Sequence, residues 1–367
     1  MLVTNMTAIR ISTIVGLFLL LNWPAGQAFA WLADCGNLPT RRVILTGKVN
    51  NQWPVLVDFS YKKNDAKKHV VVGKCIYTNH GKPLSLDGKT SHLTEDADGK
   101  VEPLILTEKD TSGVETGVWS IYPSNGGPEW LGTWTDPAGK RKYTVSLEAV
   151  AEYDHASRNI KRVVAETSTP YLLSQSHPLA KPLQELSVEA LRDAHAFVDK
   201  SLKREPGAGY AQYYPAHYKS LEWQIDHIDR HVVSMRLMKY SYQAGAAHGS
   251  YSYRSRTIAI TDGVSKQIKL ADIFDKESEW EKALRKLIAE DLVRQKALWP
   301  PKPGEDSYAD LINENVHAFT IGPHGLKFYY SAYHFSSWSR GSFYVYIPWA
   351  SISNYVDRDG VAARWVN

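Results

Sequence analysis

Cysteine is scarce in this sequence, which has only Cys35 and Cys75 among its 367 residues. Two cysteines cannot supply a zinc site of the finger type. In an exported protein such a pair usually forms one disulfide, so we predict a Cys35–Cys75 bond, with two free thiols as the alternative. The bond would tie the start of the mature chain to an early strand.

Blocks of like charge are missing as well. The 43 Lys and Arg residues nearly balance the 39 Asp and Glu residues, and the formal net charge is only +4. A mild charge spread along the chain does not indicate binding to DNA or RNA. We therefore predict no nucleic-acid partner.

The motifs of common hydrolases are also absent. The chain contains neither His-Glu-x-x-His nor Gly-x-Ser-x-Gly. His227 and His231 lie four apart but flank a predicted turn, where histidines more often face solvent than bind a metal. A triad of Ser250, His248 and Asp262 is disfavoured because sequence neighbours on a strand point to opposite faces. We predict no catalytic residues, no metal and no cofactor, and we favour a protein that is not an enzyme.

Only one apolar run is long enough to suggest a targeting segment. Residues 11–21 ("ISTIVGLFLLL") are too few for a membrane span of about 20 residues. Arg10 precedes this run, and the small-x-small sequence "AFA" follows it at 28–30. We predict a signal peptide over residues 1–30, cleaved before Trp31.

Lipidation of Cys35 is the alternative to simple cleavage. The preceding residue is Asp34, where lipobox chemistry needs a small residue. No later segment is long and apolar enough to cross a bilayer. We expect a periplasmic or secreted protein of the bacterial cell envelope, with no membrane span after signal cleavage.

Aromatic residues, by contrast, are plentiful, with 12 Trp and 21 Tyr. Two interpretations stay open. The aromatics fill the core of a strand-rich protein, or they form platforms for a glycan or a protein partner, because Tyr and Trp combine a flat apolar face with a polar tip.

Residues 31–155 predict an all-β domain. Runs rich in β-branched and aromatic residues alternate with turn sequences, a pattern typical of an antiparallel sheet that is curled or barrel-like. The predicted strands are 41–49, 53–61, 68–77, 83–86, 101–109, 115–122, 129–135 and 142–150.

Residues 160–367 predict a second domain in which strands alternate with helices. The segment 187–202 has helical periodicity, and so has the segment that starts at Ser278. Between them, 231–242 and 253–261 are predicted to be paired strands. We predict an α+β fold for the chain, with the helices of this second domain on one face of an antiparallel sheet.

The second domain resembles a known family. A strand ends in Tyr-x-x-Gly-x-Ala-His-Gly at 242–249, "IKLADIF" follows at 268–274, and the aromatic segment "GLKFYYSAYHFSSWSRGSFYVYIPWASI" closes the chain at 325–352. Over about 160–360 this resembles a domain of unknown function that occurs in the extracellular part of RsiV-type, lysozyme-sensing anti-sigma factors and beside a peptidoglycan deacetylase. The resemblance implies a lysozyme-like protein or peptidoglycan as partner.

Two positions depart from the family pattern. The family tends to have a second glycine where Ala246 stands, and a Tyr-Ala pair where the chain has 336–341 ("SSWSRG"). We expect neither an anti-sigma factor nor a deacetylase, because no sigma-binding segment or deacetylase domain accompanies the domain here.

The His-Gly element is the most distinctive candidate site. Gly245 and Gly249 allow close backbone approach, which would hold His248 rigidly between them. His248 either satisfies buried carbonyls or forms a binding rim, and catalysis is the third possibility. The residues predicted for the rim are Tyr242, His248, Tyr251, Tyr333, His334 and Trp338.

Three functions stay open at this point. The first is a cell-envelope binding protein that engages a lysozyme-like muramidase or peptidoglycan. The second is a periplasmic hydrolase acting on glycan or peptide, for which Glu222 and Asp226 are available as carboxylates. The third is an adaptor for another envelope protein.

Overall fold

The computed structural model describes residues 41–366 except 64–68, 79–80, 91–101, 125–126, 204–215, 299–308, 314–317, 336 and 338–339. The predicted signal peptide, Cys35 and Trp338 lie outside the described residues. Among the helices of the described part, none is long and apolar enough to cross a membrane.

The first eight strands form a closed antiparallel barrel. Each pairs with the next along the chain, and β1 also pairs with β8, which closes the ring. The strands are β1 (Arg41–Val49), β2 (Trp53–Lys63), β3 (His69–Tyr77), β4 (Pro83–Thr90), β5 (Leu104–Lys109), β6 (Glu115–Pro123), β7 (Glu129–Thr135) and β8 (Lys142–Ile160). Each begins within a few residues of a predicted strand, but β8 continues ten residues beyond the predicted end at residue 150.

The barrel interior is a packed core rather than a ligand cavity. Inward-facing residues such as Phe59, Trp119 and Ile121 are fully buried. Alternation of buried and exposed residues along the strands gives the barrel one apolar face, as small closed barrels require.

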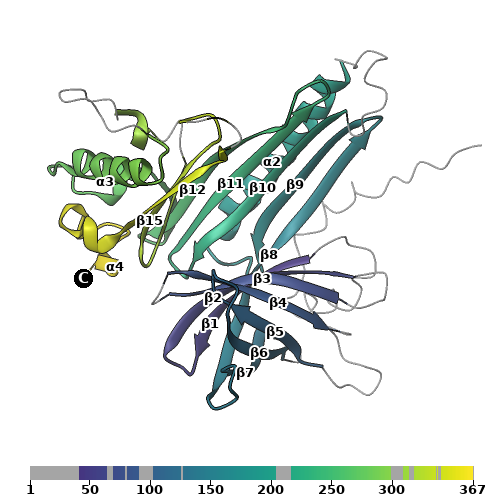
Figure 1. Cartoon of the computed structure of the whole chain (residues 1–367), viewed down its shortest axis with the longest axis vertical. Coiled ribbons are helices and arrows are strands. Elements are labelled where there is room, and N and C mark those ends of the chain that lie inside the picture. The colour runs from purple at the N-terminus through teal and green to yellow at the C-terminus, as the bar shows by residue number, and fades with distance from the viewer. Residues whose placement is uncertain are drawn as a thin grey trace, which may run out of the picture.

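Strand β8 belongs to both halves of the molecule. Its first part pairs with β1 and β7, and its last ten residues pair with β9 (Val163–Leu172). The predicted domain boundary at 155–160 therefore falls inside one continuous strand. In Figure 1 the long strands rise from the barrel in this way.

A second, open part of the sheet follows. Helix α2 (Ala180–Leu202) connects β9 to β10 (His217–Ile228), and these two strands are parallel. Antiparallel strands then continue the sheet in order: β11 (Val232–Gln243), β12 (Ser250–Thr261) and β13 (Val264–Ile268). Helix α2 buries Leu183, Ala190 and Val198 against one face of this sheet.

A small sheet covers part of the opposite face. It consists of β14 (Ala318–Gly322), β15 (Gly325–Tyr330) and β16 (Phe343–Pro348). Two serine hydroxyls of the large sheet accept hydrogen bonds from backbone amides of β14: Phe319 N to Ser255 Oγ at 2.9 Å and Ile321 N to Ser234 Oγ at 2.9 Å. These bonds fix where the small sheet docks.

Helix α3 (Trp280–Arg294) packs against the small sheet through Leu284, Ile288 and Leu292. Short helical turns complete this region: η4 (Leu270–Ile273), η5 (Ala309–Ile312), η7 (Trp349–Ser351), η8 (Ser353–Tyr355) and α4 (Ala363–Val366).

The predicted α+β class is wrong. Strands make up 53% and helices 21% of the described chain, which is mostly β with a closed eight-stranded barrel. The expected layer of helices on one face is also not formed, because α2 covers one face of the sheet whereas α3 packs on the small sheet at the other. The predicted strands 231–242 and 253–261 lie close to β11 and β12, whereas β8 extends ten residues beyond the predicted 142–150.

No disulfide is found among the described residues, and Cys35, the predicted partner of Cys75, lies outside them. Cys75 is a free, buried thiol, and it donates a hydrogen bond to Glu108 Oε2 at 3.2 Å inside the barrel. Burial, reinforced by the Glu108 carboxylate, raises the pKa of this thiol well above its ordinary value. Cys75 is therefore part of the barrel core rather than a tether for the N-terminus.

Candidate functional site

One face of the large sheet is left open beside the small sheet, and we call it the groove face. On β10 the odd-numbered residues from Leu221 to Ile225 pack against α2, so the even-numbered residues point the other way. Register places Tyr218 opposite Tyr242, and Glu222 opposite Met238. The groove face is therefore polar and aromatic, whereas the opposite face of the same strands is apolar and packs against α2.

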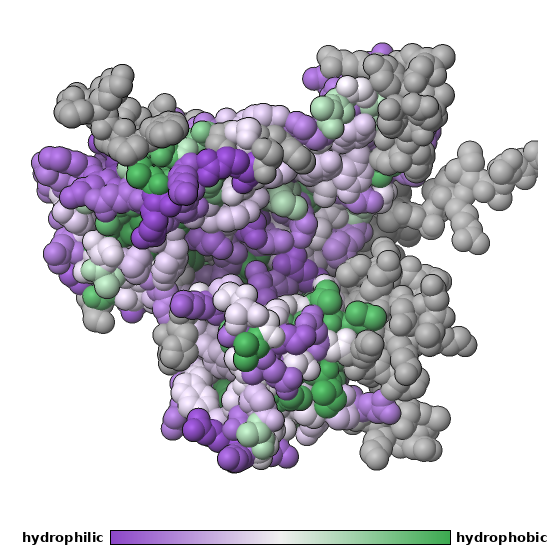
Figure 2. All heavy atoms as spheres, viewed as in Figure 1, coloured by the Kyte–Doolittle hydropathy of each residue, from purple (hydrophilic) through white to green (hydrophobic). Residues whose placement is uncertain are grey.

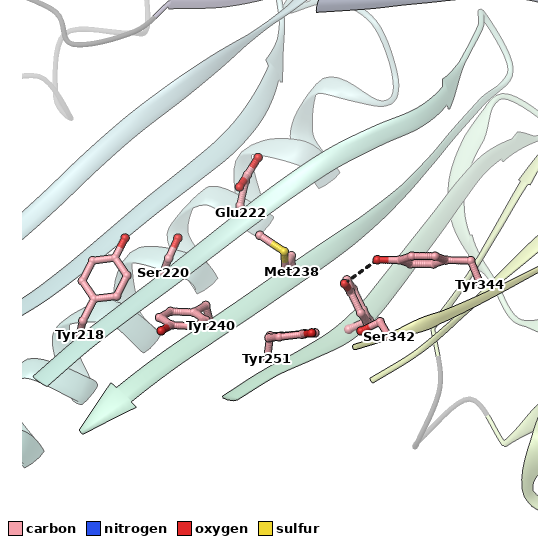
Figure 3. A pocket seen from close by; sticks show the side chains of 9 residues that line it. Tyr218, Ser220, Glu222, Met238, Tyr240, Tyr251, Ser342 and Tyr344 are labelled. Carbon is pink, nitrogen blue, oxygen red and sulfur yellow. Dashed lines mark hydrogen bonds between the residues drawn. The ribbon is translucent and has the colours of Figure 1, made fainter. Parts of the chain in front are cut away.

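A groove of about 420 Å³ lies on this face, and we call it the tyrosine groove. Figure 3 shows its side chains rising from neighbouring strands, and Figure 2 shows hydrophilic side chains gathered in the hollow between the barrel and the sheet above it. Its volume falls within the range of small-molecule sites. The lining residues are Tyr218, Ser220, Glu222, Met238, Tyr240, Tyr251, Tyr253, Ser342 and Tyr344.

Two tyrosines of the groove, Tyr218 and Tyr344, keep their hydroxyl protons at neutral pH. Burial, followed by a hydrogen bond to Glu166, raises the pKa of Tyr218 to about 12. Burial and the hydrogen bond between Tyr253 OH and Tyr344 OH, at 2.9 Å, raise the pKa of Tyr344. The groove therefore offers flat apolar rings whose polar tips donate and accept hydrogen bonds.

Beyond Tyr253 and Tyr344 the groove meets a charged cluster. Asp226 on β10 accepts hydrogen bonds from Thr320 Oγ1, at 3.0 Å, and from Tyr329 OH. Arg236 on β11 lies 3.7 Å from this carboxylate and stacks 4.9 Å from the centre of the Tyr329 ring. The cluster thus joins the large sheet to the small one.

The protonation of this cluster follows from its neighbours. Burial works to raise the pKa of Asp226, but the charges of Lys74, Arg236 and Lys327 outweigh it and lower the pKa. Burial lowers the pKa of Lys327, and Asp226 only partly offsets that effect. Asp226 is therefore ionised and held among several cations.

The barrel contributes the remaining wall. Arg42 on β1 makes a two-pronged ion pair with Asp58, with N–O distances of 2.7 and 2.6 Å, and its Nη1 lies 3.4 Å from Glu222 Oε1 in the groove. Lys74 on β3 lies 3.7 Å from the same Asp58. These contacts place barrel charges at the edge of the tyrosine groove.

The His-Gly element lies at the end of the β11–β12 hairpin. His248 Nε2 and Tyr333 OH are 2.7 Å apart, so the structure brings these two predicted rim residues together. Gly245 has φ 92°, which favours glycine, and a Cβ on Gly249 would lie 2.2 Å from Tyr240 OH. Gly249 therefore makes room for a groove tyrosine.

The other predicted rim residues are dispersed. Tyr251 lines the tyrosine groove, and Tyr242 lies on the groove face opposite Tyr218. His334 packs edge-on against Phe335, with ring centres 4.2 Å apart. Trp338, the remaining predicted rim residue, lies outside the described residues.

Two chemistries weighed from the sequence, a glycosidase carboxylate pair and a metal site, can be compared with the geometry. Glu222 and Asp226 are four residues apart on one strand, which separates their backbones by roughly 13 Å. Glycosidase carboxyl pairs lie about 5 to 9.5 Å apart, and Asp226 is already bound by Tyr329 and Thr320. In the described part of the chain no group of three His, Cys, Asp or Glu side chains could hold a metal.

Most groove residues were missed in the sequence. Alternation in "HYKSLEWQID" (217–226) does predict two faces of a strand, and it was the only available signal. It could not tell which face stays open, because α2 and the small sheet come from other parts of the chain. The missed residues are Tyr218, Ser220, Met238, Tyr240, Tyr253, Ser342 and Tyr344, together with Arg236 and Lys327.

Comparison with known proteins gives one family match. Residues 271–350 match the family described as a protein of unknown function, DUF3298. This segment of the chain is thus similar to a DUF3298 domain. This match is narrower than the predicted resemblance over 160–360 and does not reach His248, and the relation to RsiV-type proteins and deacetylases stays a prediction. The matched segment contributes α3 and the small sheet, so the tyrosine groove lies where this segment meets the preceding strands.

Two solved structures of DUF3298 family proteins are similar to the chain. One, from Bacteroides fragilis, is 18% identical with a TM-score of 0.36; the match covers 56% of this chain and 94% of that one. The other, from Pseudomonas aeruginosa, is 14% identical with a TM-score of 0.39 and the same coverage. No curated protein matches the sequence.

Proposed function

We propose that this protein is an exported cell-envelope binding protein whose tyrosine groove takes a glycan chain such as that of peptidoglycan. The tyrosine groove carries the proposal. Its rings come from β10, β11, β12 and β16 and form one continuous lining. Tyrosine rings offer apolar faces to the C–H faces of sugars, while their hydroxyls reach the ring substituents.

The polar residues of the groove suit a ligand rich in hydroxyl and amide groups. Ser220 and Glu222 lie between the tyrosines on β10. Glu222 already accepts a hydrogen bond from Gln224 Nε2 at 3.0 Å, which leaves carboxylate lone pairs for a ligand hydroxyl. Few, well-placed polar groups within an aromatic lining are typical of specific small-molecule sites.

Binding without turnover is the simplest use of this arrangement. Glu222 and Asp226 stand four residues apart along β10, and Asp226 is already held by Arg236, Tyr329 and Thr320. The exported location, the envelope setting and the choice of peptidoglycan rest on the predicted signal peptide and the RsiV-type resemblance. A lysozyme-like muramidase is the other partner that the resemblance implies.

The first test is calorimetric titration of the mature protein with soluble peptidoglycan fragments, with a C-type lysozyme in parallel. Saturable heat with the fragments and no substrate consumed is the expected result. Tyr251→Ala should weaken binding about tenfold, because it removes an aromatic face from the centre of the groove.

Tyr122→Ala is the matched control, because Tyr122 is 40% exposed on β6 of the barrel, away from the groove. Its affinity should equal that of the unmodified protein. Binding to lysozyme alone would replace the glycan with a protein partner. Silence with both ligands, or equal effects of the two substitutions, would refute the proposal.

A further inference from the structure

We propose that the cluster of cations bordering the tyrosine groove beside Tyr344 is an anion site that accepts a carboxylate carried by the bound saccharide. The site consists of Lys74, Arg236 and Lys327, which we call the cationic end. This inference rests on the proposed function and adds the chemical class of the ligand, an acidic rather than a neutral saccharide.

Charge at the cationic end is not balanced by its surroundings. Lys74, Arg236 and Lys327 all act on the single carboxylate of Asp226. Lys74 also lies 3.7 Å from Asp58, but Asp58 is already engaged by Arg42 at 2.6 Å. Buried cations need counter-charges, and this cluster has more cations than carboxylates within reach.

Lys327 shows the imbalance most clearly. The described residues offer its ammonium no hydrogen bond and no ion pair. Its Nζ lies only 5.2 Å from the centre of the Tyr329 ring and 5.6 Å from that of Tyr344. A half-buried ammonium without an acceptor keeps donors available for an anion.

Among the described residues, one buried polar atom at this end and another farther along the tyrosine groove lack hydrogen-bond partners. Arg236 Nε is buried and makes no hydrogen bond within the described part of the chain, where Asp226 Oδ2 stands 3.7 Å away. Ser342 Oγ, in the wall of the tyrosine groove, is also buried without a partner there. Unsatisfied buried donors cost free energy, which a ligand oxygen would recover.

The position of the cationic end explains why the anion should belong to the groove ligand. Tyr344 belongs to both sites, because its ring faces Lys327 and its hydroxyl bonds to Tyr253 in the groove lining. A saccharide stacked along the tyrosines therefore places its terminal substituent beside Lys327. A neutral substituent would leave the ammonium unpaired, whereas a carboxylate would pair with it.

The test compares ligands that differ only in charge. The probes are the disaccharide of N-acetylglucosamine and N-acetylmuramic acid, and the methyl ester of its lactyl carboxylate, titrated into the full mature chain. We expect the acid to bind about tenfold more tightly than the ester. Digalacturonate, titrated in parallel, carries its carboxylates on the sugar rings. Its affinity shows whether the site accepts a ring carboxylate as well as a lactyl carboxylate.

Lys327→Gln should remove the preference for the acid while retaining affinity for the ester. Lys266→Gln, an exposed position on β13, is the control and should leave both affinities unchanged. Lys74→Gln is a second variant that reduces charge from the barrel side, in case Lys327→Gln fails to fold as judged by thermal melting. It should reduce the preference for the acid.

Equal binding of acid and ester would overturn the anion site while the glycan groove stands. Loss of binding by all three saccharides would refute the proposed function, and this inference with it. Unchanged preference for the acid in both folded lysine variants would also overturn it, because the selectivity would then arise elsewhere.

Discussion

Glu108 is a carboxylate enclosed in the barrel by neutral donors. Its two oxygens accept hydrogen bonds from Trp119 Nε1 at 3.0 Å, Tyr77 OH at 3.1 Å and Thr116 Oγ1 at 2.8 Å, as well as from Cys75. It is 2% exposed, and the described residues give it no ion pair. Glu108 ties strands β3, β5 and β6 together from inside, because its hydrogen-bond donors come from β3 and β6 while it stands on β5.

We predict that Glu108→Ala destabilises the protein by about 3 kcal/mol or more, because it leaves several buried donors unpaired and opens a cavity. Urea unfolding followed by fluorescence measures the change. Glu115→Ala, at an exposed position on β6, is the control and should cost less than about 0.5 kcal/mol. Equal costs for the two variants would show that Glu108 is not a structural centre of the barrel.

Single residues also show how far the sequence predicts the site. Tyr251 was chosen as a candidate from its place after the His-Gly element, and it lines the groove. Lys327 was not chosen, because its importance depends on Asp226 and Arg236, which lie about a hundred positions away in the sequence. A cluster of charges from distant strands leaves no local pattern in the sequence, whereas a glycine-rich turn is visible in a few consecutive residues.

The β11–β12 hairpin connects the His-Gly element to the groove. Gly249 is buried, and Tyr240 lies directly over its Cα. Tyr240 can therefore occupy its position only because Gly249 has no side chain.

We predict that Gly249→Ala displaces Tyr240, because the new Cβ would lie 2.2 Å from Tyr240 OH. The expected result is a loss of about 1–3 kcal/mol in unfolding free energy, together with weaker glycan binding. Thermal melting and titration measure the two effects. Gly127→Ala is the control, since its Cβ would meet Ser124 Oγ at an ordinary 3.6 Å. Unchanged binding in a stable Gly249→Ala variant would contradict the placement of Tyr240.

Helix α2 illustrates a limit of reading elements from sequence. The prediction began the helix at Ser187, whereas it begins at Ala180 and includes Pro182 in its first turn. Proline is tolerated there because its missing N–H has no partner in the first turn. Ser187 instead bonds through Oγ to Thr169 on β9, at 3.0 Å, and so helps attach the helix to the sheet.

At the scale of the whole molecule, the turn between β10 and β11 binds the C-terminal residues. Asp229 Oδ2 lies 2.9 Å from Arg364 in α4 and 2.9 Å from His227 Nε2. Burial works to raise the pKa of Asp229, but His227, the backbone of His231 and Arg364 outweigh it and lower the pKa strongly. The ionised carboxylate therefore holds the chain end to the large sheet.

We predict that this contact is lost in acid. A carboxyl group whose pKa is lowered by folding contributes stability above its unfolded pKa of about 3.9, and this contribution falls as pH drops below that value. Asp229→Asn should lower the melting temperature at pH 7 and flatten the decline of stability below about pH 4. Asp262→Asn, in an exposed turn, is the control. Parallel pH profiles for Asp229→Asn and the unmodified protein would contradict the assignment.

The fold could be predicted strand by strand but not as a whole. Local alternation in segments such as 41–49 and 142–150 predicts strands that the structure contains. Closure of the barrel depends on pairing between β1 and β8, about a hundred residues apart, and no local pattern encodes it. The α+β prediction was wrong because the second half of the chain is also mostly strand, with β9 to β12 continuing the sheet from the barrel.

Strand β8 gives the molecule a mechanical property. Because one uninterrupted strand forms part of both the barrel and the groove face, neither half can swing about a hinge without breaking ladder hydrogen bonds along it. His155 on β8 pairs with Ser168, which in turn pairs with Glu222 in the groove. Deleting a single residue earlier in β8 would turn His155 to the opposite face. The position of the groove strand β10 relative to the barrel is thus set by the register of β8, through its pairing with β9.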